Sequence, residues 1–324
     1  MKKKILKSVK QIYFVLFVLS FVFISCSKQK DEAKPVSVVT TIFPAYDWAR
    51  NIIGNSDSVK LELLLKNGSD LHSYQPSTND IIKISTCDLF VYVGGESDKW
   101  IEDILKNSKN NNMIVVKLLD LAESHDNHTI ENCIIPEHEH HKDHIHEIDE
   151  HIWLSLKKAT KACEKIAESV EILDLGNSSV YAENLVQYKQ KLENLDGEYA
   201  KVLNTKENKT LIFCDRFPFK YLTDDYGLTV YAAFSGCSAE TEASFETVAF
   251  LTKKLDELKL NSVFTIDNSD NKIAQTVIKN STNKNCSILS LDSMQSTTWS
   301  EIQDGKNYLS VMSENLSKIK EGLK

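Results

Sequence analysis

Residues 38–53 have the sequence VVTTIFPAYDWARNII, and this stretch decides the fold class. All five residues of Val38–Ile42 are β-branched, which predicts a strand. Phe43 and Pro44 end that strand, and residues 47–53 predict a helix. The same strand pattern returns at Val59–Leu65, Leu89–Val93, Met113–Leu118, Thr210–Phe213, Thr229–Phe234, Ser262–Ile266 and Ser287–Leu291. Helical patterns lie between these strands, so we expect α/β architecture with parallel sheets covered on both faces.

A stretch without strand patterns separates the two groups of strands. It runs from Leu154 to about Leu203, and its second part, from Tyr181 onward, keeps helical spacing with no proline and one glycine. This pattern predicts one long helix. We therefore expect two lobes, at 37–153 and 205–324, each a roughly four-stranded parallel sheet with flanking helices. The helical segment 154–204 would join them.

The composition limits the classes of partner. The chain has 324 residues, of which 42% are hydrophobic and 26% charged, as in ordinary folded proteins that face water. It carries 38 basic against 46 acidic residues, a formal net charge of −8. Because an acidic surface repels phosphate backbones, we do not expect a nucleic-acid partner. Cations are better candidates for binding to this chain.

The N-terminus predicts export. Met1–Gln11 contains five lysines and no acidic residue, and the 13 residues Ile12–Ile24 are apolar apart from one serine. This apolar run is shorter than the ~20 residues of a membrane-spanning helix and fits a signal peptide at 1–25. Phe23–Cys26 resembles a bacterial lipobox, which implies acylation of Cys26 and a tether at 26–36. The expected location is the outer face of the bacterial cell membrane; cleavage with an incidental Cys26 is the alternative.

Eight of the nine histidines lie between His125 and His151. The densest part, residues 137–147, has no apolar periodicity and interleaves histidines with acidic residues. Neutral imidazole is a common ligand of zinc-like ions, so this segment predicts an auxiliary metal-binding loop, with a plain polar surface loop as the alternative. Its histidines are His138, His140, His141, His144 and His146.

Two motifs, in order, resemble those of the metal-specific substrate-binding proteins of ABC importers, the zinc and manganese cluster. The first is GSDLHSYQPS at 68–77, and the second is DEHIWLS at 149–155, directly after the histidine-rich segment. Thr40–Pro44, Gly94–Glu96 with Trp100, and Tyr226–Leu228 fit the same family, so the resemblance covers the chain from about residue 36 onward. It implies His72 and His151 as metal ligands.

The resemblance implies two more ligands, from the second lobe. The acid after the last strand is Asp292. The third position is occupied by Asp215 when counted along the strand, and by Arg216 when counted back from the Tyr226–Leu228 motif. Arginine has no acceptor atom, so the candidates are Asp215, water in a three-ligand site, or Cys214. His72, Asp215 and Asp292 each follow a predicted strand, where open α/β sheets bind ligands.

The implied function is capture of a divalent ion between the lobes and delivery to an ABC permease and its ATPase. We expect the chain to work as a monomer and to have no enzymatic activity. The histidine-rich segment next to a ligand is a feature of zinc members, so we expect Zn²⁺, with Mn²⁺ second. The alternatives are a secreted zinc hydrolase with an open three-ligand site and a lipid-anchored surface adhesin. The chain has neither a His-Glu-x-x-His helix nor a Gly-x-Ser-x-Gly elbow.

Imidazole ligation predicts a pH dependence. A histidine must be neutral to bind metal, so affinity for zinc should fall as the pH drops from about 7 to about 5. Competition with a zinc chelator at a series of pH values measures this. A flat profile over that range would remove imidazole from the ligand set.

Overall fold

The computed structural model describes residues 34–122, 133–135, 149–236 and 242–323. The chain divides into two compact units, Met1–Lys34 and Pro35–Lys324, and the fold described here is that of the second. The predicted signal peptide, Cys26 and the auxiliary histidines lie outside the described residues. No helix among the described residues is long and apolar enough to cross a membrane.

The first sheet has four parallel strands in the order β2-β1-β3-β4. Their bounds are β1 Val36–Thr40, β2 Val59–Leu63, β3 Leu89–Tyr92 and β4 Ile114–Lys117. Every residue of the central strand β3 is buried, as expected where helices cover both faces. The helices that connect these strands are α2 Phe43–Ile53, α3 Thr78–Thr86 and α4 Lys99–Lys106.

The second sheet has five parallel strands in the order β5-β7-β6-β8-β9. Their bounds are β5 Cys133–Ile134, β6 Thr210–Phe217, β7 Thr229–Ser235, β8 Ser262–Ile266 and β9 Ser287–Leu291. Three helices connect β6 to β9 in turn: α7 Lys220–Tyr226, α8 Phe245–Glu257 and α9 Lys272–Asn280. The predicted α/β class with two parallel sheets is therefore confirmed.

The second sheet differs from the prediction in two details. The short strand β5 pairs with β7 of the second sheet, although the predicted first lobe extended to residue 153. Pairing with β7 gives hydrogen-bond partners to an otherwise open sheet edge. Strand β6 also continues beyond Phe213, after a register shift between Phe213 and Arg216, where polar side chains interrupt the apolar pattern.

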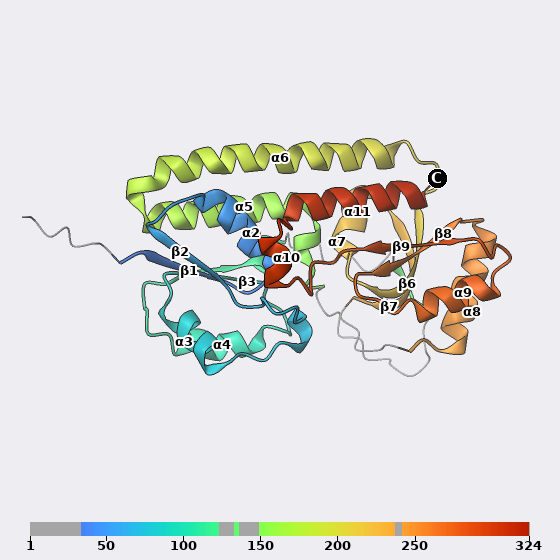
Figure 1. The fold of residues 1–324 in the computed structure, drawn as a ribbon, viewed down its shortest axis with the longest axis horizontal. Coiled ribbons are helices and arrows are strands. Elements are labelled where there is room, and N and C mark those ends of the chain that lie inside the picture. The colour runs from blue at the N-terminus through green and yellow to red at the C-terminus, as the bar shows by residue number, and fades with distance from the viewer. Residues whose placement is uncertain (1–33, 123–132, 136–148, 237–241, 324) are drawn as a thin grey trace, which may run out of the picture. The chain divides into compact units, whose positions relative to one another are not determined.

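A layer of long helices spans both sheets (Figure 1). It consists of α5 Leu156–Leu173, α6 Ser178–Asn204 and α11 Tyr308–Gly322, with the short α10 Trp299–Gln303 beside it. The 27-residue α6 packs on α2 and α5 near the first sheet and on α7 and α11 near the second. Its buried residues keep helical spacing: Tyr181, Tyr188, Leu192, Leu195, Tyr199 and Leu203. A single rod therefore connects the lobes, as predicted.

Tyr308 joins this helical layer to the segment that carries His151. Its side chain is fully buried, its hydroxyl donates to the Trp153 carbonyl at 2.7 Å, and its backbone nitrogen donates to Asp47 Oδ2 at 3.0 Å. The ring also packs edge-on against Trp48, with centroids 5.3 Å apart. One residue of α11 thus connects helix α2 to the chain beside His151.

Removing the Tyr308 hydroxyl should destabilise the fold. Tyr308→Phe keeps the ring but leaves the buried Trp153 carbonyl without this donor, so the free energy of unfolding should fall by about 1–3 kcal/mol. Urea denaturation measures the change. Tyr46→Phe is the matched control, because no hydrogen bond to the Tyr46 hydroxyl occurs among the described residues, and equal effects of the two substitutions would contradict the expectation.

Candidate metal centre

His72 is placed by a short helical turn after β2. Asp70 caps the N-terminus of the 3₁₀ turn Leu71–Ser73, because its Oδ1 accepts a hydrogen bond from the His72 backbone nitrogen at 3.0 Å. Leu71 is buried and fixes the turn against the core, while the His72 side chain stays 17% exposed. The carboxylate cap and the apolar anchor together direct the imidazole to the carboxyl end of the first sheet.

His151 is held by its own neighbour in sequence. Asp149 Oδ1 accepts hydrogen bonds from both the backbone nitrogen and the Nδ1 of His151, at 2.9 and 3.0 Å. The buried 3₁₀ turn Ile152–Leu154 follows, and the Trp153 ring lies edge-on at 5.2 Å from the imidazole. His151 itself is fully buried, so the surrounding residues hold its ring in one orientation.

The two imidazoles face each other with their Nε2 atoms 3.2 Å apart. His72 Nδ1 lies 2.7 Å from Ser97 Oγ and 3.5 Å from Glu150 Oε2, so both Nδ1 atoms point at oxygen. A carboxylate only accepts hydrogen bonds, which places the proton of neutral His151 on Nδ1 and leaves a lone pair on Nε2. Two converging nitrogens at this distance match the edge of a zinc tetrahedron, roughly 3.3 Å for Zn–N bonds of about 2.05 Å.

The surroundings favour neutral imidazole at His72. Burial is the largest influence and lowers the pKa of His72, and the neighbouring His151 lowers it further. The carboxylates of Asp70 and Glu150 act in the opposite direction, while the Arg216 guanidinium adds to the lowering. With a lower pKa, His72 stays neutral, and so able to bind metal, to a lower pH than an exposed histidine.

Two buried carboxylates lie behind the pair. Glu150 is 3% exposed; its Oε1 accepts from Ser97 N at 2.9 Å, and its Oε2 has no hydrogen-bond partner among the described residues. Asp98, 1% exposed, accepts from Gly94 N at 2.8 Å, and burial together with the charge of Glu150 raises its pKa to about 7. Gly95 has φ +86°, and a Cβ there would collide with Glu150. The buried carboxylate of Glu150 attracts a cation.

Asp215 does not join the histidines. Its Oδ2 accepts a short hydrogen bond from Ser269 Oγ, and its Oδ1 accepts from the Arg216 backbone nitrogen at 2.8 Å. Arg216 instead reaches the first lobe, with its guanidinium nitrogen 3.7 Å from Asp70 Oδ2. Cys214 is buried in an apolar cluster of the second sheet, and burial raises the pKa of its thiol well above the usual range.

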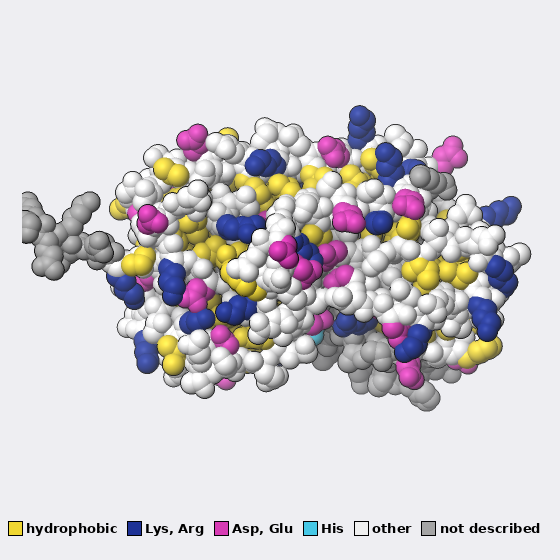
Figure 2. Space-filling view, in the orientation of Figure 1, with side chains coloured by type: hydrophobic (Ala, Val, Ile, Leu, Met, Phe, Trp, Pro, Cys, Tyr) yellow, Lys and Arg dark blue, Asp and Glu magenta, His cyan; other side chains and the backbone are white. Residues whose placement is uncertain are grey.

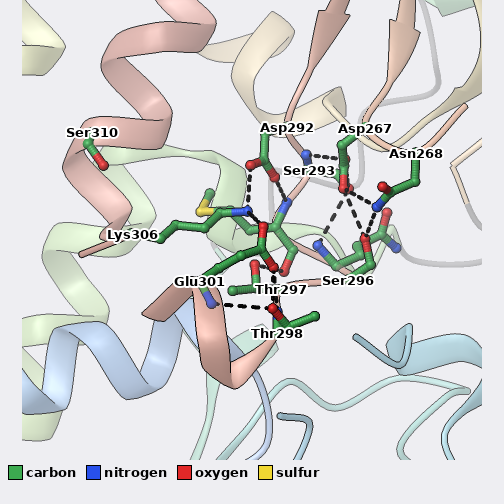
Figure 3. A network of polar contacts seen from close by, with 12 residues as sticks. Asp267, Asn268, Asp292, Ser293, Ser296, Thr297, Thr298, Glu301, Lys306 and Ser310 are labelled. Carbon is green, nitrogen blue, oxygen red and sulfur yellow. Dashed lines mark hydrogen bonds and ion pairs between the residues drawn. The ribbon is translucent and has the colours of Figure 1, made fainter. Parts of the chain in front are cut away.

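Asp292 belongs to a separate polar network (Figure 3). It pairs with Lys306 Nζ at 2.8 Å and accepts from Met294 N at 2.8 Å. Burial raises the pKa of Asp292, as does the charge of Asp267, while Lys306 lowers it. Across the part of the chain that the structure describes, no three or more His, Cys, Asp or Glu side chains cluster as a metal site. The four predicted ligands are therefore not assembled together, because each aspartate is engaged within its own lobe.

Gln295 approaches the histidines, although no sequence motif pointed to it. Its Nε2 lies 3.0 Å from His151 Nε2 and 3.4 Å from Asp70 Oδ1. Gln295 lies in the loop after β9, three residues beyond Asp292, so the rule about carboxyl ends of strands could have indicated it. Ser97, after β3, could have been found by the same rule. Figure 2 shows only a small area of histidine surface on the face in view.

The chain matches the ZnuA family, described as the periplasmic component A of a zinc-uptake complex, over residues 38–322. The chain belongs to this family. The predicted resemblance to metal-specific substrate-binding proteins is thus confirmed.

Individual ZnuA-family relatives agree with this. The zinc-binding protein AdcA of Streptococcus pyogenes is 30% identical over 319 residues, which cover 94% of this chain and 61% of AdcA. The chain thus spans less than two thirds of that relative. The manganese ABC transporter substrate-binding lipoprotein PsaA of Streptococcus mitis is 28% identical, covering 96% of this chain and 97% of PsaA. The Zn(II)-bound ZnuA-like domain of Streptococcus pneumoniae AdcA has a TM-score of 0.70 at 27% identity, covering 89% of this chain and 99% of that domain.

The orientation of His151 by Asp149 should matter for metal affinity. Asp149→Ala removes the acceptor of the Nδ1 proton, and loss of such a partner weakens metal binding by about 10- to 100-fold. Chelator competition with zinc measures the change. Asp103→Ala on α4 is the control, since that side chain is 84% exposed and pairs only with Lys106 among the contacts described. If the two variants bind zinc equally well, Asp149 does not orient a ligand.

Proposed function

We propose that this chain is the extracytoplasmic substrate-binding protein of an ABC importer. It captures Zn²⁺ between its two lobes and delivers the ion to a permease driven by an ATPase. Mn²⁺ is the second candidate cargo, because Mn²⁺ binds a given site of nitrogen and oxygen ligands more weakly than Zn²⁺. Membership of the ZnuA family and the zinc and manganese relatives support this function.

One observation carries the proposal, and it is the pair of converging Nε2 atoms. The two Nε2 atoms face each other at 3.2 Å, with the Nδ1 of His151 directed at Asp149 and the Nδ1 of His72 at Ser97 Oγ. When both imidazoles carry their proton on Nδ1, both Nε2 atoms present a lone pair, and two acceptors at this distance repel each other. A divalent ion bound to both nitrogens removes the repulsion and gains charge stabilisation from the carboxylates of Asp70 and Glu150 nearby.

The arrangement of the lobes suits cargo rather than a resident ion. Contacts between the lobes flank the histidines: Trp153 Nε1 donates to the Ser293 carbonyl at 2.9 Å, and Arg216 reaches Asp70. Both partners from the second lobe lie at the carboxyl end of its sheet. Because α6 packs against both lobes, closure around the ion is a small rotation, and an ion that is gripped by both lobes is released when the permease separates them.

The proposed location follows from the N-terminal sequence. A diacylated Cys26 would anchor the chain to the outer face of the cell membrane, because two acyl chains hold a protein there stably while one does not. PsaA, which matches over almost its whole length, is named a lipoprotein. We propose that the anchored chain works as a monomer and meets its permease at the same membrane.

Zinc binding and hydrolytic activity distinguish a binding protein from a zinc hydrolase. The purified chain should bind one Zn²⁺ tightly per molecule, bind Mn²⁺ more weakly, and hydrolyse neither esters nor peptides. Replacing His72 and His151 together by alanine, in a chain lacking residues 137–147, should abolish the tight site. The matched control is the same deletion with both histidines retained.

Zinc content after dialysis and chelator competition measure binding, and a chromogenic ester and peptide series measures turnover. In cells, zinc accumulation from zinc-poor medium should be lost with the chain and restored by the wild-type chain but not by the double variant. Hydrolysis by the zinc-loaded chain, or a tight site that survives both substitutions, would refute the proposed function.

A further inference from the structure

We propose that Gln295 supplies the second lobe's ligand to the transported ion, through its side-chain carbonyl oxygen. This inference rests on the proposed function and assigns the ligand that neither Asp215 nor Asp292 provides. Gln295 reaches the histidine pair from the loop after β9, so an ion bound by all three residues is held by both lobes.

The geometry places the Gln295 amide at a ligand position. Its terminal nitrogen lies 3.0 Å from His151 Nε2, and His151 Nε2 lies 3.2 Å from His72 Nε2. Neighbouring ligands of a tetrahedral zinc with bonds of about 2.0–2.1 Å are roughly 3.3 Å apart. The distances from His151 Nε2 to His72 Nε2 and to the Gln295 amide are therefore both close to the separation of two zinc ligands.

A half-turn of the amide exchanges its two terminal atoms. Rotation about the Cγ–Cδ bond brings Oε1 to the place of Nε2 with almost no change in shape, and the torsion is a soft one. In the structure, Nε2 donates toward His151 Nε2 and toward Asp70 Oδ1, 3.4 Å away. A bound cation reverses that preference, because it attracts the carbonyl oxygen and repels the amide hydrogens.

The loop that carries Gln295 is held from several directions (Figure 3). Asp267, just after β8, accepts from the backbone nitrogen and hydroxyl of Ser293, at 2.7 and 2.8 Å, and from the Ser296 hydroxyl at 3.0 Å. The Ser293 carbonyl accepts from Trp153 of the segment that carries His151. Met294 has φ +60°, a left-handed turn that these contacts support. Such anchoring fixes the backbone on both sides of Gln295.

The neighbouring aspartates have a structural role in this arrangement. Asp267 is engaged with Ser293 and Ser296, and Asp292 with Lys306 and the Met294 nitrogen, so both carboxylates shape the loop. The ligand that remains is a neutral amide. Two imidazoles and one amide oxygen leave the ion's charge balanced only by carboxylates outside the ligand set, which favours release to a permease over permanent retention.

The test compares three single variants of the full chain for zinc affinity by chelator competition. Gln295→Leu keeps the bulk but has no donor atom, so affinity should fall at least about 10-fold. Gln295→Glu supplies a charged oxygen at the same reach, so affinity should rise at least about 10-fold. Trp299→Leu removes a different contact between the lobes, the edge-on contact of its ring with Tyr46 at 5.7 Å, and should not weaken binding, which separates ligation from simple loss of contact between the lobes.

A spectroscopic measurement tests ligation directly. In a chain labelled with ¹³C-glutamine, the side-chain carbonyl signal that disappears in Gln295→Leu should shift when Zn²⁺ is added. Unchanged or tighter zinc binding by Gln295→Leu would overturn the inference, as would a carbonyl signal that does not move. If the His72 and His151 double variant loses zinc while Gln295→Leu keeps it, this inference fails alone. If neither loses it, the proposed function fails as well.

Discussion

The convergence of two imidazole nitrogens is the interaction on which the rest of the structure depends. His72 and His151 are 79 residues apart in sequence, and each is placed by a short turn that an aspartate caps or orients. Each Nδ1 is directed at a hydroxyl or carboxylate oxygen, so the two Nε2 atoms cannot turn away without losing a hydrogen bond. We propose that the pair is preorganised for a cation.

The architecture explains why this pair can form where both lobes meet. Parallel strands bring their carboxyl ends to one edge of each sheet, and the loops at those edges carry His72, Ser97 and Gln295. The helical layer fixes how the two edges face each other, since α6 packs on both lobes and Tyr308 joins α11 to the Trp153 segment. A long rod and buried hydrogen bonds limit the freedom of the lobes, which keeps Gln295 of the second lobe close to the two histidines.

Much of this followed from the sequence because the signals were local. The β-branched runs placed β8 and β9 at their observed bounds, and the spacing of Tyr181 to Leu203 identified α6. The motifs at 68–77 and 149–155 pointed to His72 and His151, whose Nε2 atoms lie 3.2 Å apart in the structure. Their role as metal ligands stays a prediction. The contacts of these histidines with the second lobe could not be obtained in this way. Asp215 and Asp292 stand after or near strand ends as expected, but Ser269, 54 residues beyond Asp215, and Lys306 take up their oxygens. Partner choice of this kind depends on tertiary contacts that residue spacing does not encode.

The location of the bound ion tests the central claim most directly. Crystals of the chain grown with one equivalent of Zn²⁺, with diffraction collected above and below the zinc absorption edge, would locate the metal by its anomalous signal. The account predicts one dominant peak within about 2.0–2.1 Å of both His72 Nε2 and His151 Nε2. A fully occupied peak elsewhere in the chain, with no density between these two nitrogens, would contradict it.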